Sequence, residues 1–332
     1  EKKNIIVSIS DHDLRLTKTY FDLDINGHKV NKKDIRDVFS KNLNRFFSSG
    51  MYLLHTIPTS FFIDDKITEK NPIGVSCRKL GLRSINFLIK EEIINQYRKT
   101  FKKSEIIQPD NFIYSGLASS ISSLTKMEKK NGATSIDFGA GSLKIVTFYK
   151  NNIEFVKNIP LGGDYVTNDI SKILEINTDQ AEYIKIVNGN LSLFSQDKFK
   201  IEEPSGSHKV ISSNLLQGII KPRYEEIIEI CRNVLDENLI SRSGMDTIVF
   251  SGGGAEIRGF QSFSSKIFNR KVRISKPFSF HEDLEKPEFT TLNGLIKICN
   301  DVTFKNIIIN KSIQNEHGIL DRFNNWILDS IT

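Results

Sequence analysis

Apolar and polar positions in the first hundred residues follow two different periods, which predicts a mixed α/β module. Between residues 30 and 47, apolar side chains recur every three or four positions and predict a helix with one buried face. Short apolar runs predict strands at 4–10, 53–57, 61–63 and 83–89. The region is long enough to form a compact module of its own.

From Thr134 onward, the pattern becomes an apolar strand, a glycine turn and a second strand, in the sequence TSIDFGAGSLKIVTFY. Together with a third apolar run at 153–159, these segments predict a three-stranded meander. The next stretch, PLGGDYVTNDISKIL, predicts a helix that Thr167 and Asn168 can cap, because both side chains carry acceptors for free backbone N–H groups.

The rest of this second region is predicted to contain two more helices and one buried strand. Residues 179–187 have helical spacing, and Asn188 and Gly189 end the pattern. The polar residues 190–212 predict a loop, and an apolar stripe over 216–235 predicts a long helix. A buried strand at 247–250 then leads into SGGGAEIRGF, a strand–glycine–helix junction.

Length and composition narrow the class of protein. A chain of 332 residues is too long for one ordinary core and predicts two lobes. No run approaches the ~20 apolar residues that a membrane-spanning helix needs. The net charge of +6 is modest and its basic clusters are short, so no nucleic-acid partner is predicted. The three cysteines and six histidines are scattered without a metal-ligand spacing, and the cysteines are predicted to be buried thiols.

Two glycine turns, Asp137–Ser142 and Ser251–Gly254, each follow a predicted strand. Glycine lets a phosphate or a flat base approach the backbone closely, and free N–H groups at such turns favour anions. Taken singly, DFGAGS is equally typical of a hairpin loop, and GGG of a tight packing junction. Each turn alone therefore leaves the structural and the binding interpretation open.

The order of motifs is more specific than any one of them. Between the two glycine turns lie GGD at Gly162–Asp164 and the helical segment AEYIK at 181–185. This order resembles the second lobe of the actin and Hsp70 ATPase superfamily. Within it, PLGGDYVTNDISKIL, AEYIKIVNG, IIKPRYEEI and SGGGAEIRGF resemble the FtsA family, and HTIPTSFFID with NPIGVSCRKL resembles the extra subdomain of that family. The resemblance extends from Ile5 to about Ile296.

The resemblance implies an α/β, actin-like (ribonuclease-H-like) two-lobed ATPase fold with an FtsA-type extra α/β subdomain near the N-terminus. The implied divisions are the inserted subdomain at 1–105, the remainder of the first lobe at 106–133, the core of the second lobe at 134–190 and 244–300, its small subdomain at 191–243, and a linker with a C-terminal helix at 301–332.

The resemblance also assigns an ATP site to these motifs. The residues implied to hold the phosphates are Asp137, Gly139, Gly141 and Ser142. Gly162, Gly163 and Asp164 match the GGD turn beside the nucleotide, Glu182 and Lys185 match the pair that flanks the adenosine, and Gly252, Gly253 and Gly254 match the loop on the adenine side. Asp137 is also implied to lie near Mg²⁺, since carboxylates suit that ion. A simpler interpretation of Glu182 and Lys185 is an exposed pair one helical turn apart.

Two residues depart from the family pattern, and one motif is missing. Ala140 replaces a glycine of the phosphate loop and Lys144 replaces its closing aspartate, so we expect ATP binding with weak or no hydrolysis. The first phosphate loop of the family is not found in Glu1–Ser10, and we expect the sequence to be a fragment.

The end of the chain has the pattern of a tethered amphipathic helix. Residues 301–317 are polar, and after them the apolar residues fall on one helical arc: Ile319, Leu320, Phe323, Trp326, Ile327 and Ile331. Docking of this helix on the protein's own core is one interpretation. The FtsA resemblance implies the other, in which these residues lie in the membrane interface.

The resemblance finally implies a cell-division adaptor that tethers FtsZ filaments to the cytoplasmic face of the cell membrane at the division site. Its implied partners are the FtsZ C-terminal peptide, other copies of itself in filaments, and later division proteins. Arg223 and Glu226, on the predicted long helix, are the candidates for the FtsZ contact, although solvated helix charges look the same. The alternatives are a PilM-like scaffold of a pilus machine and an ATPase enzyme of the same superfamily.

Overall fold

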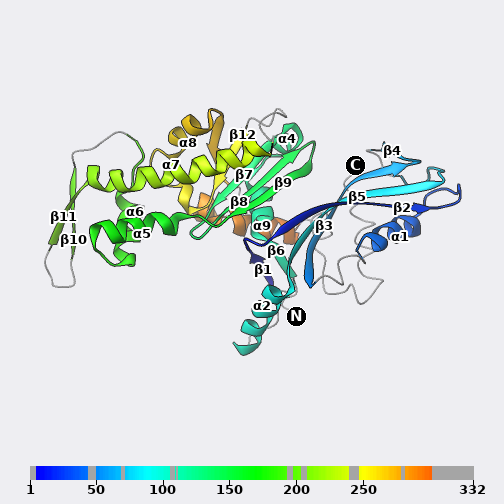
Figure 1. Cartoon of the computed structure of the whole chain (residues 1–332), viewed down its shortest axis with the longest axis horizontal. Coiled ribbons are helices and arrows are strands. Elements are labelled where there is room, and N and C mark those ends of the chain that lie inside the picture. Colours follow the sequence, from blue (N-terminus) through cyan, green and yellow to red (C-terminus); the bar gives the residue numbers. More distant parts are fainter. Residues whose placement is uncertain are drawn as a thin grey trace. The chain divides into compact units, whose positions relative to one another are not determined.

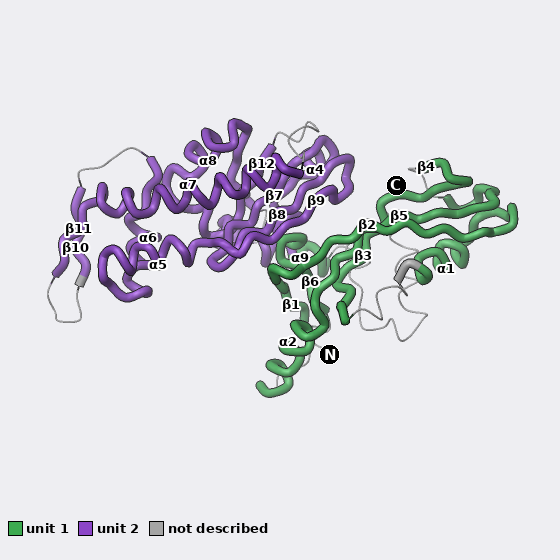
Figure 2. The backbone as a smooth tube through the Cα atoms, viewed as in Figure 1, with its two compact units in different colours: residues 1–118, 295–332 green, residues 119–294 purple. Residues whose placement is uncertain are grey.

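The computed structural model describes residues 5–43, 50–68, 72–104, 109, 111–192, 197–202, 208–238, 247–277 and 281–300. The chain divides into two compact units, residues 1–118 with 295–332, and residues 119–294, which Figure 2 distinguishes by colour. We call them unit 1 and unit 2. None of the helices within the described ranges combines the length and apolar character needed to cross a bilayer.

Unit 1 is built around an antiparallel sheet. Its elements are β1 Ile6–Ile9, β2 Arg15–Asp24, α1 Lys32–Leu43, β3 Met51–Ile63, β4 Lys66–Thr68, β5 Lys79–Lys90, α2 Glu91–Lys103 and β6 Asn111–Tyr114, and α3 Ser115–Ser123 begins in it (Figure 1). The four-stranded sheet has the order β2-β5-β3-β4. Helix α1 packs on β2 and β5, and its Val38 is fully buried in the same core cluster as Leu80 of β5.

The strand predictions for unit 1 divide β3 in two and leave out β2, β4 and β6. The runs 53–57 and 61–63 belong to one strand, β3, which continues through Pro58 because the register shifts between Pro58 and Ser60. A bulge of this kind accommodates a proline that cannot donate to the ladder. Strand β2 was not predicted, since its pattern of exposed and half-buried residues lacks a clear apolar alternation.

Strands β1 and β6 form a separate parallel pair in unit 1, with Ile6 opposite Asn111 and Ile9 opposite Tyr114. The whole four-stranded sheet therefore lies, in sequence, between two strands that are neighbours. His55 of β3 connects that sheet to the pair, because the backbone N–H of Tyr114 donates to its Nε2 at 2.9 Å. His55 is fully buried, and burial lowers its pKa from 6.5 to about 3.

Unit 2 contains a five-stranded sheet and most of the helices. Its elements are α4 Lys126–Asn131, β7 Ala133–Phe138, β8 Leu143–Tyr149, β9 Asn152–Ile159, α5 Gly163–Leu174, α6 Thr178–Asn188, β10 Lys198–Glu202, β11 His208–Ser212, α7 Ser213–Glu237, β12 Thr247–Ser251, the 3₁₀ turn η3 Gly253–Ala255, α8 Phe260–Phe268, β13 Lys271–Ile274, the 3₁₀ turns η4 Glu282–Leu284 and η5 Pro287–Phe289, and α9 Thr290–Asn300, which continues into unit 1.

The sheet of unit 2 has the order β13-β12-β7-β8-β9. Strands β13, β12 and β7 are parallel, whereas β7, β8 and β9 form the predicted antiparallel meander. Its core includes three rings in mutual contact, Phe138 of β7, Tyr224 of α7 and Phe260 of α8, with centroids 5.3–6.0 Å apart. The long helix α7 also packs on α5 and α8, so it links the strand layer to the outer helices.

Two local predictions for unit 2 are wrong. Helix α5 begins at Gly163 after the N-cap residue Gly162, so Thr167 lies inside the helix and its hydroxyl donates to the carbonyl of Gly163. The predicted loop at 190–212 contains the antiparallel hairpin of β10 and β11. Strand β10, KFKIE, alternates apolar and polar residues over only five positions, and β11, HKVIS, does not alternate.

Candidate functional site

The two glycine turns lie at the same edge of the unit 2 sheet. Strands β7 and β12 are parallel neighbours, with Asp137 opposite Ser251 at their carboxyl ends. The loop 139–142 follows β7 and the turn 252–254 follows β12. In open α/β sheets, ligands bind outside the carboxyl ends of parallel strands. The structure therefore brings together two motifs that are more than a hundred positions apart in sequence.

The GGD turn packs directly on the first glycine loop. The N–H of Gly163 donates to the carbonyl of Gly139 at 3.0 Å, and the N–H of Asp164 donates to that of Ala140 at 2.9 Å. A Cβ on Gly162 would lie 2.6 Å from the carbonyl oxygen of Gly139, so no other residue fits there without a shift of the loop. These contacts fix the loop against the start of α5.

The adjacent part of the loop retains unused hydrogen-bonding capacity. Within the described residues, the N–H groups of Ala140 and Gly141 donate to no protein acceptor. Both residues are exposed, and a Cβ on Gly141 would have no neighbour nearer than Asp164 Oδ2 at 4.0 Å. Exposed N–H donors beside open space are the features that suit an anion.

Glu182 and Lys185 lie together on α6, but Lys185 is not a solvated residue. Its side chain is only 11% exposed, and Nζ lies 2.6 Å from Glu182 Oε2. The ammonium also donates to Thr167 Oγ1 at 2.8 Å and to the Gly163 carbonyl at 3.2 Å. The lysine thus joins α6 to the first turn of α5, directly behind the GGD turn.

The glycines of the second turn differ in what surrounds them. Gly252 has a φ of +82°, and a Cβ there would lie 2.6 Å from Asp137 Oδ1. A Cβ on Gly254 would lie 2.7 Å from Cγ of Phe138. Gly253, in contrast, is exposed, and a Cβ at this position would have no neighbour within 4 Å. The fold requires Gly252 and Gly254, but it does not require Gly253.

Tyr224 supports this turn from α7. Its hydroxyl donates to the Gly254 carbonyl at 3.0 Å. Burial, with a smaller contribution from the charge of Glu182, raises the pKa of Tyr224, so the hydroxyl stays a donor at physiological pH. The sequence indicated Tyr224 only as part of an apolar stripe. No spacing signal could have shown that its polar end reaches a backbone carbonyl thirty residues away.

Asp137 is enclosed by groups of this chain. Its Oδ2 lies 3.4 Å from Nζ of Lys144 and 3.5 Å from Oγ1 of Thr291, while Oδ1 lies against Gly252. The side chains of Asp137 and Lys144 are 8% and 12% exposed. Mg²⁺ needs oxygen ligands at about 2.1 Å and usually keeps several waters. The magnesium role of Asp137 stays a prediction, and this enclosure argues against it.

The remaining predicted residues lie elsewhere or outside the described part of the chain. Arg223 of α7 is bound within the protein, with Nε 2.6 Å from Asp169 Oδ2 on α5 and a second ion pair to Glu226. The role of Arg223 and Glu226 in partner binding stays a prediction. Ile319, Leu320, Phe323, Trp326, Ile327 and Ile331 lie outside the described residues.

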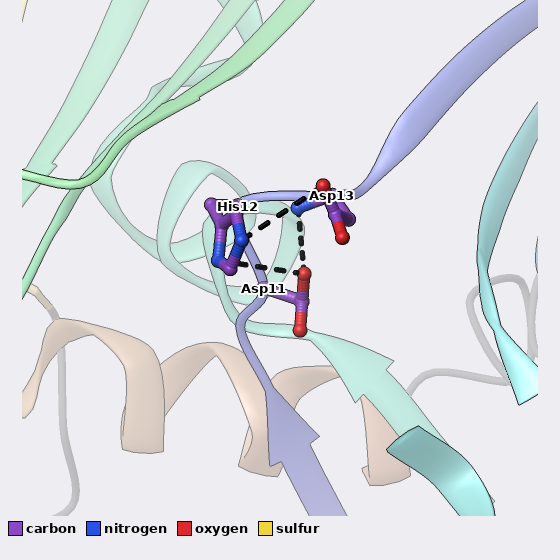
Figure 3. Close-up of side chains that lie close together, drawn as sticks. All are labelled: Asp11, His12 and Asp13. Carbon is purple, nitrogen blue, oxygen red and sulfur yellow. Dashed lines mark hydrogen bonds and ion pairs between the residues drawn. The ribbon is translucent and has the colours of Figure 1, made fainter. Parts of the chain in front are cut away.

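Three neighbouring side chains in unit 1 form the one candidate metal cluster of the described residues. Figure 3 shows Asp11, His12 and Asp13, with each His12 ring nitrogen 3.8 Å from a carboxylate oxygen. His12 is 70% exposed, and the N–H of Asp13 donates to Asp11 Oδ1 at 2.6 Å. Asp13 is also paired with Lys90, and this bond lowers the pKa of Asp13. The geometry is that of a charged surface turn.

Two family models match the chain. The model described as cell division protein FtsA matches residues 134–294, which include the glycine turns of unit 2. The model described as the SHS2 domain inserted in FtsA matches residues 12–86, which include most of the four-stranded sheet of unit 1. Together the two matches cover most of unit 2 and about half of unit 1.

Similar proteins and structures agree with these matches. The cell division protein FtsA of Buchnera aphidicola subsp. Schizaphis graminum is 28% identical over 316 residues, covering 91% of this chain and 75% of that protein. A chain of the PilM-PilN type IV pilus biogenesis complex is similar with a TM-score of 0.61 at 16% identity, covering 89% of this chain and 79% of that one.

A third similarity is to MreB5 of Spiroplasma citri bound to ADP, with a TM-score of 0.52 at 16% identity, covering 85% of this chain and 79% of that one. At such identities the two structures show the fold alone. The predicted actin-like α/β fold with an additional inserted subdomain is confirmed. The residue-level boundaries of the predicted subdomains stay a prediction.

Proposed function

Because this chain belongs to the FtsA family of cell-division proteins, we propose that it is an ATP-binding adaptor that attaches FtsZ filaments to the cell membrane. Membership of this family supports a role in cell division at the division site. In this proposal the chain also binds ATP and FtsZ, self-associates into filaments and lies on the cytoplasmic face of the membrane.

The main support for an ATP site is that the two glycine turns lie together at the carboxyl ends of β7 and β12. Gly141 and Gly253 are exposed glycines with room for a side chain, and Gly141 has an unused N–H donor. A phosphate over Gly141 and a base over Gly253 would explain why neither position carries a side chain. The similar fold of MreB5, which was solved with ADP, supports a nucleotide as the ligand.

The ATP site is tested by filling this space. Gly141→Leu and Gly253→Leu meet no atom of the protein closely at Cβ and have ordinary backbone angles, so both variants should fold. Each is expected to weaken ATP binding at least about tenfold, or 1.4 kcal/mol, because the leucine occupies the ligand's volume. Isothermal titration calorimetry with ATP measures the change.

The matched control is Gly218→Leu, on the exposed side of α7, where a Cβ also has nothing within 4 Å. It should bind ATP like the wild type. If all three leucine variants bind ATP equally well, the glycine turns are packing features and the ATP site is refuted.

The membrane and FtsZ parts of the proposal are tested by liposome flotation. The full chain is compared with a chain ending at Asn310, each with and without the FtsZ C-terminal peptide. We expect only the full chain to float, and the peptide to float with it. Equal flotation of the two chains would refute the tether, and a peptide that stays at the bottom would refute the FtsZ contact.

The amount of hydrolysis is expected to be small. Ala140 is exposed in the phosphate loop, and Lys144 takes the position where the family resemblance implies an aspartate. ATP is therefore proposed to act by favouring one conformation of the protein more than as a fuel. The PilM similarity concerns the fold alone, and both matching family models are those of FtsA.

A further inference from the structure

Lys144 is placed by the β-hairpin of unit 2 on the same face as Asp137. The two residues are directly opposite each other in the antiparallel pair of β7 and β8, so their side chains lie on one side of the sheet. Nζ lies 3.4 Å from Asp137 Oδ2, and both side chains are nearly buried. A positive charge with little exposure is thus fixed at the base of the loop 139–142.

The ammonium is also close to the loop itself. A Cβ on Gly139 would lie 2.8 Å from Nζ of Lys144, so the lysine occupies the space beside this glycine. The next two residues of the loop, Ala140 and Gly141, carry the N–H groups that have no protein acceptor in the described chain. An ammonium has three donors, and the pair with Asp137 leaves capacity for phosphate oxygens.

A divalent ion fits poorly in the same place. Asp137 Oδ2 already faces Lys144 and Thr291, and a Cβ on Gly252 would lie 2.6 Å from Oδ1. A cation bound to this carboxylate would lie beside a fixed ammonium, with little exposed surface for the waters that Mg²⁺ retains. Lys144 already provides an ammonium donor for phosphate oxygens at this position.

We propose that Lys144 takes the place of a divalent cation at this site, so that the phosphate groups of ATP bind to unit 2 without magnesium. This inference rests on the proposed ATP site and makes it more specific. Lys144 balances the charge of Asp137 before ATP binds and contacts phosphate oxygens once it has bound. The loop N–H groups provide the remaining donors, and no metal joins the nucleotide to Asp137.

The experiment measures ATP binding by the full chain, by calorimetry, with magnesium present and with a chelator in its place. We expect the two dissociation constants to agree within about threefold. In chelator, Lys144→Met should weaken binding by about tenfold to a hundredfold, because a charge-assisted bond is lost. Lys144→Arg keeps the charge and should retain metal-free binding, and Lys144→Asp should make binding depend on magnesium.

Two further variants separate binding from folding. Lys144→Met leaves Asp137 buried without its partner, so the double variant Asp137→Asn with Lys144→Met removes both charges and should keep the thermal stability of the wild type. Lys172→Met, at an exposed lysine of α5 in the same unit, controls for the loss of any positive charge. It should bind ATP like the wild type in chelator.

The outcomes distinguish the two proposals. Wild-type binding that is lost in chelator overturns the role of Lys144 and leaves the ATP site intact. The role of Lys144 is also overturned if the double variant binds ATP in chelator as tightly as the wild type. No binding under either condition, by a chain that is folded by circular dichroism, refutes the ATP site itself.

Discussion

Both units contain glycines at turns, but the surroundings of these glycines differ. In unit 1, Gly27 and Gly74 have φ values of +80° and +86°, and a Cβ at either would meet nothing within 4 Å. In unit 2, a Cβ on Gly162 or Gly252 would collide with the backbone or side chain of another segment. The first kind of glycine serves only its own turn, whereas the second lets two segments approach.

A glycine motif in a sequence does not by itself show whether the glycine is needed for chain reversal or for close packing of two segments. The turn at Gly74 is needed for chain reversal. Gly162 and Gly252 are needed because the GGD turn and the second glycine turn each press against the loop or strand end at 137–140. Close packing of this kind gives a rigid edge, and rigidity suits a site that must hold a ligand in one geometry.

The largest expected difference between the units is their response to acid. His55 of unit 1 has its pKa lowered to about 3 by burial, against 6.5 when unfolded, so the unfolded state binds the extra proton between these values. Stability should fall as pH falls from 6.5 toward 3, by up to on the order of 5 kcal/mol. The described histidines of unit 2, His208 and His281, are exposed and not buried.

Denaturant unfolding followed by circular dichroism at a series of pH values measures this slope. His55→Gln keeps an acceptor for the Tyr114 N–H but cannot take up a proton, so it should flatten the slope between pH 6.5 and 3. If the slopes of the wild type and His55→Gln coincide, the burial of His55 does not govern acid sensitivity.

The next effect is expected at the crowded glycine of unit 2. Gly162→Ala places a methyl group against the carbonyls of Gly139 and Ala140, and we expect a loss of about 3 kcal/mol of unfolding free energy. Gly218→Ala, in open space on helix α7, should instead stabilise the protein by about 1 kcal/mol. Denaturant titration measures the unfolding free energy of the two variants. Equal values would show that the loop shifts to accommodate the methyl group without loss of stability.

A smaller loss is expected from Tyr224→Phe. The change removes one hydroxyl and leaves the Gly254 carbonyl without its 3.0 Å donor, which should cost about 1.5 kcal/mol. Tyr97→Phe in unit 1 is a matched removal of a phenolic oxygen. Thermal unfolding of both variants tests whether the second glycine turn depends on support from α7, and an unchanged melting temperature for Tyr224→Phe would contradict it.

The smallest effect is expected in unit 1. Gly74→Ala has room for its methyl group but forces a positive φ on an L-residue, so we expect a loss of about 1 kcal/mol. Denaturant titration of Gly74→Ala measures this loss of unfolding free energy. A loss as large as that of Gly162→Ala would remove the distinction between the two kinds of glycine.

The sequence predicted the site's strands and turns better than its contacts. The alternation in 134–149 identified the hairpin, and a turn between Phe138 and Leu143 already pairs Asp137 with Lys144 in register. The contacts of Lys185 were not predicted, because the three-residue spacing from Glu182 does not show which face of the helix packs on α5. Strand β10 was missed because its alternation extends over only five residues, and β11 was missed because it has no alternation.

The parallel pair of β1 and β6 has a consequence for synthesis of the chain. About 100 residues separate the two strands, so at 5–20 residues per second β1 leaves the ribosome some 5–20 s before its partner. The inserted antiparallel sheet needs no residue beyond β5 and can close during that interval. We therefore expect the insertion to fold co-translationally, and β1 to find its place only when β6 has emerged.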